Sequence, residues 1–314
     1  ETECYQRVSD QYDIAYFARE GIPALNLQDY PYQTIPKCFG LTDLSALESS
    51  GILRLQNPAG LDLMGQGILV GFVDTGIDYT HPAFQNLDGS TRIVGIWDQT
   101  IEDGTPPEGF YYGQFFDRAM INQALRSEQP LEIVPSRDEI GHGTFLAGTA
   151  CGTADLSQDF SGAVPQAAIA MVKCKQAKPY LREYYFIPDD VPCYQENDLM
   201  LGMSWLMNLA DQLQMPLILC VGMGSSMGNH AGEEPVPMLT DNFGRRGQRA
   251  VVVSAGNEAG ARHHYSKRGL EEGMTDRIEI SVGENVPGCY MEFWASIPEI
   301  YRLSVVSPSG ERFS

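Results

Sequence analysis

The sequence alternates short apolar runs with segments of helical pattern, and this alternation most constrains the fold. The run at 67–73 (GILVGFV) is apolar throughout and lies between turn residues, which is typical of a strand buried on both faces of a sheet. The other predicted strands are 92–97, 168–173, 217–221 and 250–254. Helical patterns occur at 142–151 and at 197–215, where Asn197 is expected to cap the helix start. This order predicts an α/β fold, a doubly wound, mainly parallel sheet with helices on both faces.

The regions on either side of this core have a different pattern. Residues 1–60 carry four prolines and only brief helix or strand patterns, so we expect an extended N-terminal arm. After residue 257 the predicted elements are short strands at 277–282, 290–295 and 301–306, followed by a turn at 307–310 (SPSG). The predicted organisation is an arm at 1–60, a main domain at 61–282 and the start of a β-rich insertion at 283–314.

Charge and cysteine content argue against several kinds of partner. The chain has 21 Lys and Arg against 41 Asp and Glu, and this net charge of −20 repels nucleic acid and anionic membranes. No apolar stretch approaches the roughly 20 residues that span a bilayer, and the N-terminus lacks a signal-peptide pattern. The seven cysteines are odd in number and show no CxxC spacing, so we expect mostly free thiols, with one disulfide as an alternative.

Three polar motifs follow predicted strands, at the sheet edge where open α/β folds place their sites. Asp74 (in DTGID) directly follows the run at 67–73, and a carboxylate there can orient a histidine. His142 (in GHGT) opens a predicted helix, and Asn257 (in SAGNE) can donate a hydrogen bond to an oxyanion. Each motif alone also fits a turn or a helix cap. Their combination, in this order, indicates a catalytic site.

The motifs DTGID, HGTxxAGT and AGNE, in this order, resemble those of the subtilisin family of serine peptidases. Further segments resemble the clostridial branch of that family, which includes the Csp spore-germination proteases. These segments are 71–80 (GFVDTGIDYT), 95–100 (GIWDQT), 177–183 (AKPYLRE) and 261–265 (ARHHY). The similarity extends from about Ile35 to Tyr265.

The resemblance implies a serine endopeptidase with an Asp-His-Ser triad. Asp74 would be the orienting acid, His142 the general base and acid, and Asn257 an oxyanion-hole donor. A flexible or unfolded polypeptide substrate would lie as an extended strand between two glycine-bearing walls. The wall residues would be Cys220, Gly222, Met223 and Gly224 on one side, and Ala255 and Gly256 on the other.

The family's Gly-Thr-Ser nucleophile motif does not occur in these 314 residues. Minimal members carry the serine roughly 65 residues after the asparagine, and clostridial members insert a β-rich jelly roll before it. We therefore expect the serine in sequence beyond Ser314, through truncation or on a companion fragment left by a proteolytic nick. The resemblance also implies a zymogen whose prodomain is removed before Glu1. Secreted, cell-surface or spore-associated locations are favoured. No metal or other cofactor is expected, with calcium as an alternative.

Two other functions remain open. The branch contains pseudoproteases, so the chain can belong to a catalytically inactive subtilase that acts as a binding or signalling protein. The residue at the missing serine position distinguishes an active peptidase from such an inactive subtilase. An esterase that uses the same triad is disfavoured because glycine walls suit peptide backbone. A role in spore germination, in which a cortex-hydrolase zymogen is processed, is one hypothesis implied by the resemblance.

Overall fold

The computed structural model describes residues 4–7, 13–16, 52–56, 62–155, 157, 160–228, 230–254, 256, 260–284, 286, 288–296 and 298–314. The chain divides into two units, Glu1–Thr42 and Asp43–Ser314. In the first unit, β1 (Cys4–Arg7) pairs antiparallel with β2 (Asp13–Tyr16). Most of the predicted arm at 1–60 lies outside the described residues.

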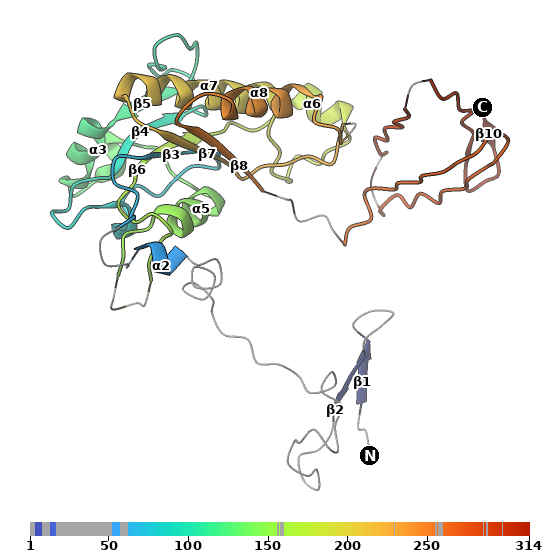
Figure 1. Ribbon diagram of the computed structural model, residues 1–314, viewed down its shortest axis with the longest axis horizontal. Coiled ribbons are helices and arrows are strands. Elements are labelled where there is room, and N and C mark those ends of the chain that lie inside the picture. Colours follow the sequence, from blue (N-terminus) through green and yellow to red (C-terminus); the bar gives the residue numbers. More distant parts are fainter. Residues whose placement is uncertain are drawn as a thin grey trace, which may run out of the picture. The chain divides into compact units, whose positions relative to one another are not determined.

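The second unit is built on a six-stranded sheet in the order β5-β4-β6-β3-β7-β8 (Figure 1). The strands are β3 (Leu69–Asp74), β4 (Ile93–Asp98), β5 (Gln114–Asp117), β6 (Ala168–Lys173), β7 (Leu217–Val221) and β8 (Arg249–Val253). All neighbours are parallel except β5 and β4. β3 lies between β6 and β7 and is buried along its whole length, as its continuous apolar run predicts. The five predicted strands and the α/β class are confirmed, and β5 is an additional edge strand.

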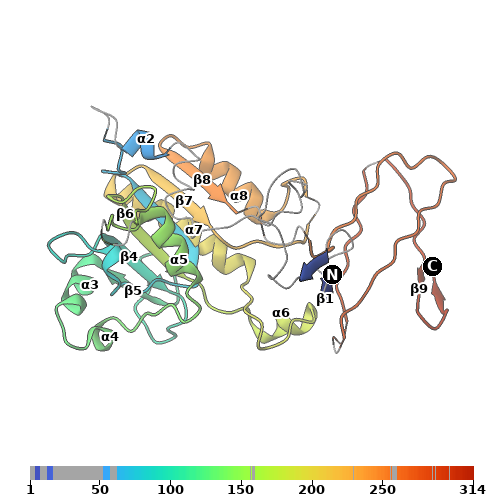
Figure 2. The same cartoon turned by 90° about the horizontal axis from the view of Figure 1, so that it is seen from below.

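Helices lie on both faces of this sheet, with α7 and α8 on one face and α5 on the other (Figures 1 and 2). The helices are α2 (Ile52–Gln56), α3 (Arg118–Leu125), α4 (Pro130–Ile133), α5 (His142–Cys151), α6 (Pro179–Tyr184), α7 (Glu196–Leu213) and α8 (Pro235–Gly244), with a 3-10 turn η2 (Pro82–Phe84). The predicted helices at 142–151 and 197–215 are confirmed as α5 and α7. The prediction that Asn197 caps α7 is wrong, because Gln195 holds the cap position. Asn197 lies in the first turn and accepts a hydrogen bond from Gln195 Nε2 at 3.0 Å.

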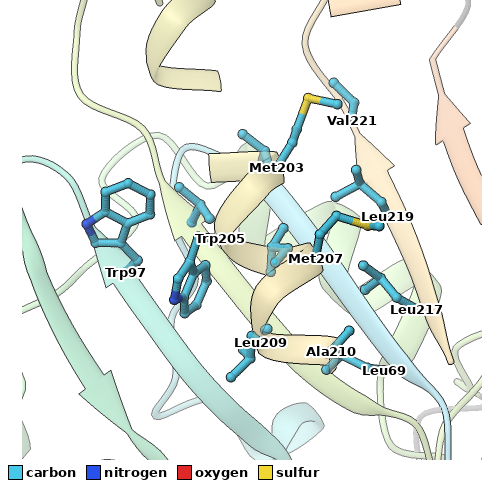
Figure 3. Packing of buried hydrophobic residues seen from close by; sticks show 14 of the residues in the cluster. Leu69, Trp97, Met203, Trp205, Met207, Leu209, Ala210, Leu217, Leu219 and Val221 are labelled. Atoms are coloured by element: carbon cyan, nitrogen blue, oxygen red, sulfur yellow. The ribbon is translucent and has the colours of Figure 1, made fainter. Parts of the chain in front are cut away.

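Each face of the sheet buries its own apolar cluster, since successive strand residues point to opposite faces. On one face α7 packs against β3, β4 and β7 (Figure 3). Trp97 of β4 meets Trp205 of α7 edge to face, with ring centroids 6.0 Å apart, an arrangement that favours aromatic pairs. On the other face Phe72 and Met171 of the sheet join Ala147 of α5 in the second cluster. The sheet and α5 therefore form one packed body, which places the helix start against the strand ends.

A buried arginine joins several segments at the amino end of β4. Arg92 is only 6% exposed and donates hydrogen bonds to the carbonyls of Ala83, Cys151 and Ala167. We expect Arg92→Met to lower the free energy of unfolding by about 2 kcal/mol, because the carbonyls of Cys151 and Ala167 lose this donor, whereas that of Ala83 still accepts from Thr153 N. Urea denaturation measures the change. The exposed Arg118→Met serves as control and should change stability by less than about 0.5 kcal/mol; equal effects of the two variants would contradict the role of Arg92.

The strands predicted after residue 276 are mostly absent. Residues 277–282 and 290–295 form no strand, and within 301–306 only β9 (Val305–Val306) is one, paired with β10 (Arg312–Phe313). The predicted turn at 307–310 is confirmed as the link between β9 and β10, with Gly310 at φ 91°. An apolar β-like pattern becomes a strand only when a neighbouring strand satisfies its backbone groups. Within the described residues no such neighbour pairs with 277–282.

Candidate active site

The fold brings Asp74 and His142 together at the carboxyl end of β3. Asp74 is the last residue of β3 and His142 is the first residue of α5. His142 Nδ1 lies 2.7 Å from Asp74 Oδ1. An ionised carboxylate can only accept, so Nδ1 carries the hydrogen and the neutral ring has its free lone pair on Nε2. This arrangement suits a histidine that accepts a proton from a nucleophile.

Two glycines leave room for this pair. A Cβ atom on Gly143 would overlap the carbonyl oxygen of Gly76 and would lie 3.1 Å from Asp74 Cβ. A Cβ atom on Gly222 would lie 2.6 Å from Asp74 Oδ2 and 3.3 Å from His142 Cε1. A side chain at Gly143 would require the Gly76 backbone to shift, and one at Gly222 would have to displace Leu146 and Asp74, because interiors are close-packed. Gly222, predicted as a wall residue, therefore borders the Asp74–His142 pair directly.

A second carboxylate, Asp138, holds the start of α5 and was not among the residues predicted from sequence. Its Oδ1 atom accepts hydrogen bonds from Thr75 Oγ1 at 2.7 Å and from Gly141 N at 2.9 Å. Its Oδ2 atom accepts from the backbone N and from Oγ1 of Thr144, at 2.8 and 2.7 Å. Burial raises the pKa of Asp138, but these hydrogen bonds outweigh it and leave the pKa below its ordinary value. The available signal was an Asp four residues before the His in DEIGHGT, within reach of the first helical turn.

For the other predicted wall residues, the structure shows only part of the surroundings. The side chain of Cys220, in β7, packs against the cluster shared with α5, and that of Met223 packs against the cluster under α7. Gly224 has open space where a Cβ atom would stand. On the second wall, Gly256 is described beyond the end of β8, with φ 82°. Asn257 and Ala255 lie outside the described residues, so the oxyanion and wall roles remain predictions.

Three further observations bear on cofactors and partners. Within the described part of the chain, no group of three or more His, Cys, Asp or Glu side chains is placed to hold a metal ion. The same part contains no helix long and apolar enough to cross a membrane. Among the described cysteines, free thiols occur at Cys151, Cys174, Cys193, Cys220 and Cys289. These five agree with the expectation of mostly free thiols.

Comparisons with known proteins show to which proteins this chain is similar. Residues 65–280 match the subtilase family, Peptidase S8. The structure of the Clostridium perfringens CspB protease is similar, with a TM-score of 0.59 and 33% identity, over 70% of this chain and 42% of that one. Subtilisin-like protease SBT2.1 of Arabidopsis thaliana is 32% identical over 133 residues, 36% of this chain and 16% of its own. Thermitase of Thermoactinomyces vulgaris is 27% identical over 124 residues, 39% of this chain and 32% of its own.

This chain therefore spans less than half the length of each of these relatives. The family match nevertheless covers well over half of this chain, from 65 to 280. It includes both residues of the hydrogen-bonded Asp74–His142 pair. From the match and the sheet that carries this pair, we conclude that the chain belongs to the subtilase family.

Proposed function

We propose that this chain supplies the acid and the base of a serine endopeptidase. The observation that carries the proposal is the 2.7 Å hydrogen bond between His142 Nδ1 and Asp74 Oδ1. The Asp74 side chain is 1% exposed and the His142 side chain is 45% exposed, so a buried carboxylate orients a ring that substrate can reach. Membership of the subtilase family supports the same activity. The nucleophilic serine would come from sequence after Ser314 or from a companion C-terminal fragment.

In the proposed mechanism His142 Nε2 takes the proton of the serine hydroxyl while the serine oxygen attacks a peptide carbonyl. Asp74 holds the ring and stabilises the positive charge that it acquires. Asn257 donates a hydrogen bond to the developing oxyanion. His142 then passes the proton to the leaving amine and activates water to hydrolyse the acyl-enzyme. The substrate is an extended polypeptide that lies along the glycine-bearing wall at Gly222.

Labelling of the complete protein with a fluorophosphonate, followed by peptide mass spectrometry, tests this proposal. The expected result is one labelled serine, in sequence outside the present 314 residues. His142→Ala should remove the label, because the serine is then no longer activated. A complete protein that contains the serine segment but takes no label would overturn the peptidase proposal and favour an inactive subtilase that binds a partner.

A further inference from the structure

A pocket of about 340 Å³ is lined by residues that lie close to Asp74 and His142 in the chain. It is formed at the carboxyl ends of β3, β4 and β6 and by the loop before α5. Its lining includes Thr75, Thr100, Glu139, Ile140, Lys173 and Tyr194. Thr75 follows Asp74 directly, and Ile140 lies two residues before His142. A substrate side chain that enters this pocket would therefore belong to a residue close to the peptide bond that is cleaved.

The pocket has a buried ion pair on its inner side and a solvent-exposed acid at its rim. Lys173, whose side chain is 10% exposed, lies 3.9 Å from the buried carboxylate of Asp98. Its Nζ atom also donates to Glu139 Oε2 at 2.8 Å. Glu139 is 66% exposed. Because Asp98 already balances the charge of Lys173, the charge of Glu139 is in excess.

The surroundings add further negative charge. The carboxylates of Asp74 and Asp138 lie directly behind Thr75, which bonds to Asp138 and follows Asp74 in the chain. Lys175 adds no net charge, because its Nζ atom pairs with Asp198 Oδ1 at 3.3 Å. The pKa of the lining residue Tyr194 is raised to about 12, mainly by burial and to a smaller extent by the nearby Cys174, Asp74 and Asp138. The five carboxylates named around the pocket outnumber Lys173, Lys175 and Arg182, whose guanidinium donates to the lining residue Gln176 at 2.7 Å, so the charges around the pocket are net negative.

We propose that this pocket takes a basic side chain, lysine or arginine, of the polypeptide substrate, with Glu139 as its ion-pair partner. The inference rests on the proposed function, because the pocket serves a residue next to the bond that the Asp74–His142 pair would help to cleave. Lys173 occupies Oε2 of Glu139, and a carboxylate has a second oxygen that accepts from an ammonium or guanidinium group. The exposed Ile140 at the rim suits the aliphatic stem of such a side chain. An acidic side chain would instead have to displace Glu139 from Lys173.

Peptide substrates that differ in one residue test the proposal on the complete protein. Arg, Lys, Gln or Glu is placed in turn at each of four positions before the cleaved bond. At one position kcat/KM should be about tenfold higher with Arg or Lys than with Glu. This ratio should shrink as salt rises from about 0.05 to about 0.5 M, because a rim ion pair is screened. Glu139→Gln should reduce the ratio about fivefold, while the exposed Glu108→Gln, outside the pocket, should leave it unchanged.

Dissociation constants of the same peptides with the His142→Ala variant separate the pocket from catalysis. If the wild-type protein cleaves none of the peptides while the variant binds Arg or Lys peptides more tightly in a way that depends on Glu139, the pocket is supported and the peptidase is overturned. Cleavage without charge preference at any position would overturn the pocket and leave the peptidase standing. A charge preference that survives Glu139→Gln, or the absence of any preference in both assays, would also overturn the pocket assignment.

Discussion

Replacing Asp74 with asparagine should lower kcat/KM for peptide cleavage by about 10⁴-fold in the complete protein. The carboxylate accepts the hydrogen of His142 Nδ1 and thereby leaves the lone pair on Nε2. An asparagine can turn its NH₂ group toward Nδ1, which then becomes the acceptor and moves the ring hydrogen to Nε2. In that tautomer the ring cannot accept the proton of a serine hydroxyl.

The control for this variant is Asp103→Asn, which removes the charge of an exposed carboxylate outside the site. Its kcat/KM should remain within about twofold of the wild-type value, since surface substitutions rarely matter. Circular dichroism and urea denaturation establish that both variants fold. A folded Asp74→Asn protein with less than a tenfold loss of kcat/KM would rule out the proposed role of Asp74.

Replacing Asp138 with asparagine should lower kcat about 100-fold and change KM little. The Asp138 carboxylate accepts four hydrogen bonds, from Thr75, Gly141 and Thr144. The single amide oxygen of an asparagine cannot accept all four. The start of α5 would loosen, and a displacement of His142 by about 1 Å is enough for a loss of this size. Asp138 is thus a positioning residue, and steady-state kinetics on a peptide substrate measure its effect.

Asp117 provides a control, because it is the N-cap residue of α3 and its side chain accepts a hydrogen bond from Met120 N at 2.8 Å. Asp117→Asn should lower stability slightly and leave kcat unchanged. A kcat that falls equally in both variants would show that Asp138 acts only through general stability. An unchanged kcat in Asp138→Asn would contradict the positioning role outright.

The pKa of Asp138 adds a pH-dependent prediction for the same variant. This pKa lies below its ordinary value in the folded chain, so the folded state binds the proton less readily than the unfolded state does. The resulting stability is present above the ordinary aspartate pKa of about 4 and is lost as the pH falls through the folded value. On acidification, Asp138→Asn should therefore lose less stability than the wild-type protein does. Urea denaturation at a series of pH values measures both losses. Equal losses of stability in the variant and the wild-type protein would contradict this account.

The predictions from sequence succeeded where a local pattern decides the structure. The continuous apolar run of β3 and the helical spacing of α7 each identify an element without knowledge of its neighbours. β5, with four residues, was not predicted, because so short an edge strand has little pattern of its own and depends on pairing with β4. The prediction of a strand at 277–282 was wrong for the same reason, since no partner strand pairs with this segment in the described residues.

The sequence by itself determined the α/β class and the candidates Asp74 and His142, because parallel strands bring their carboxyl ends to one edge of a sheet. Only the tertiary structure decided that these two side chains, 68 residues apart in sequence, meet at hydrogen-bond distance, with Gly222 against them. It also decided the role of Asp138 and the excess negative charge around Lys173. The physical reason is that hydrogen bonds and ion pairs depend on distances of a few ångström between segments far apart in the chain, and no local pattern encodes those distances.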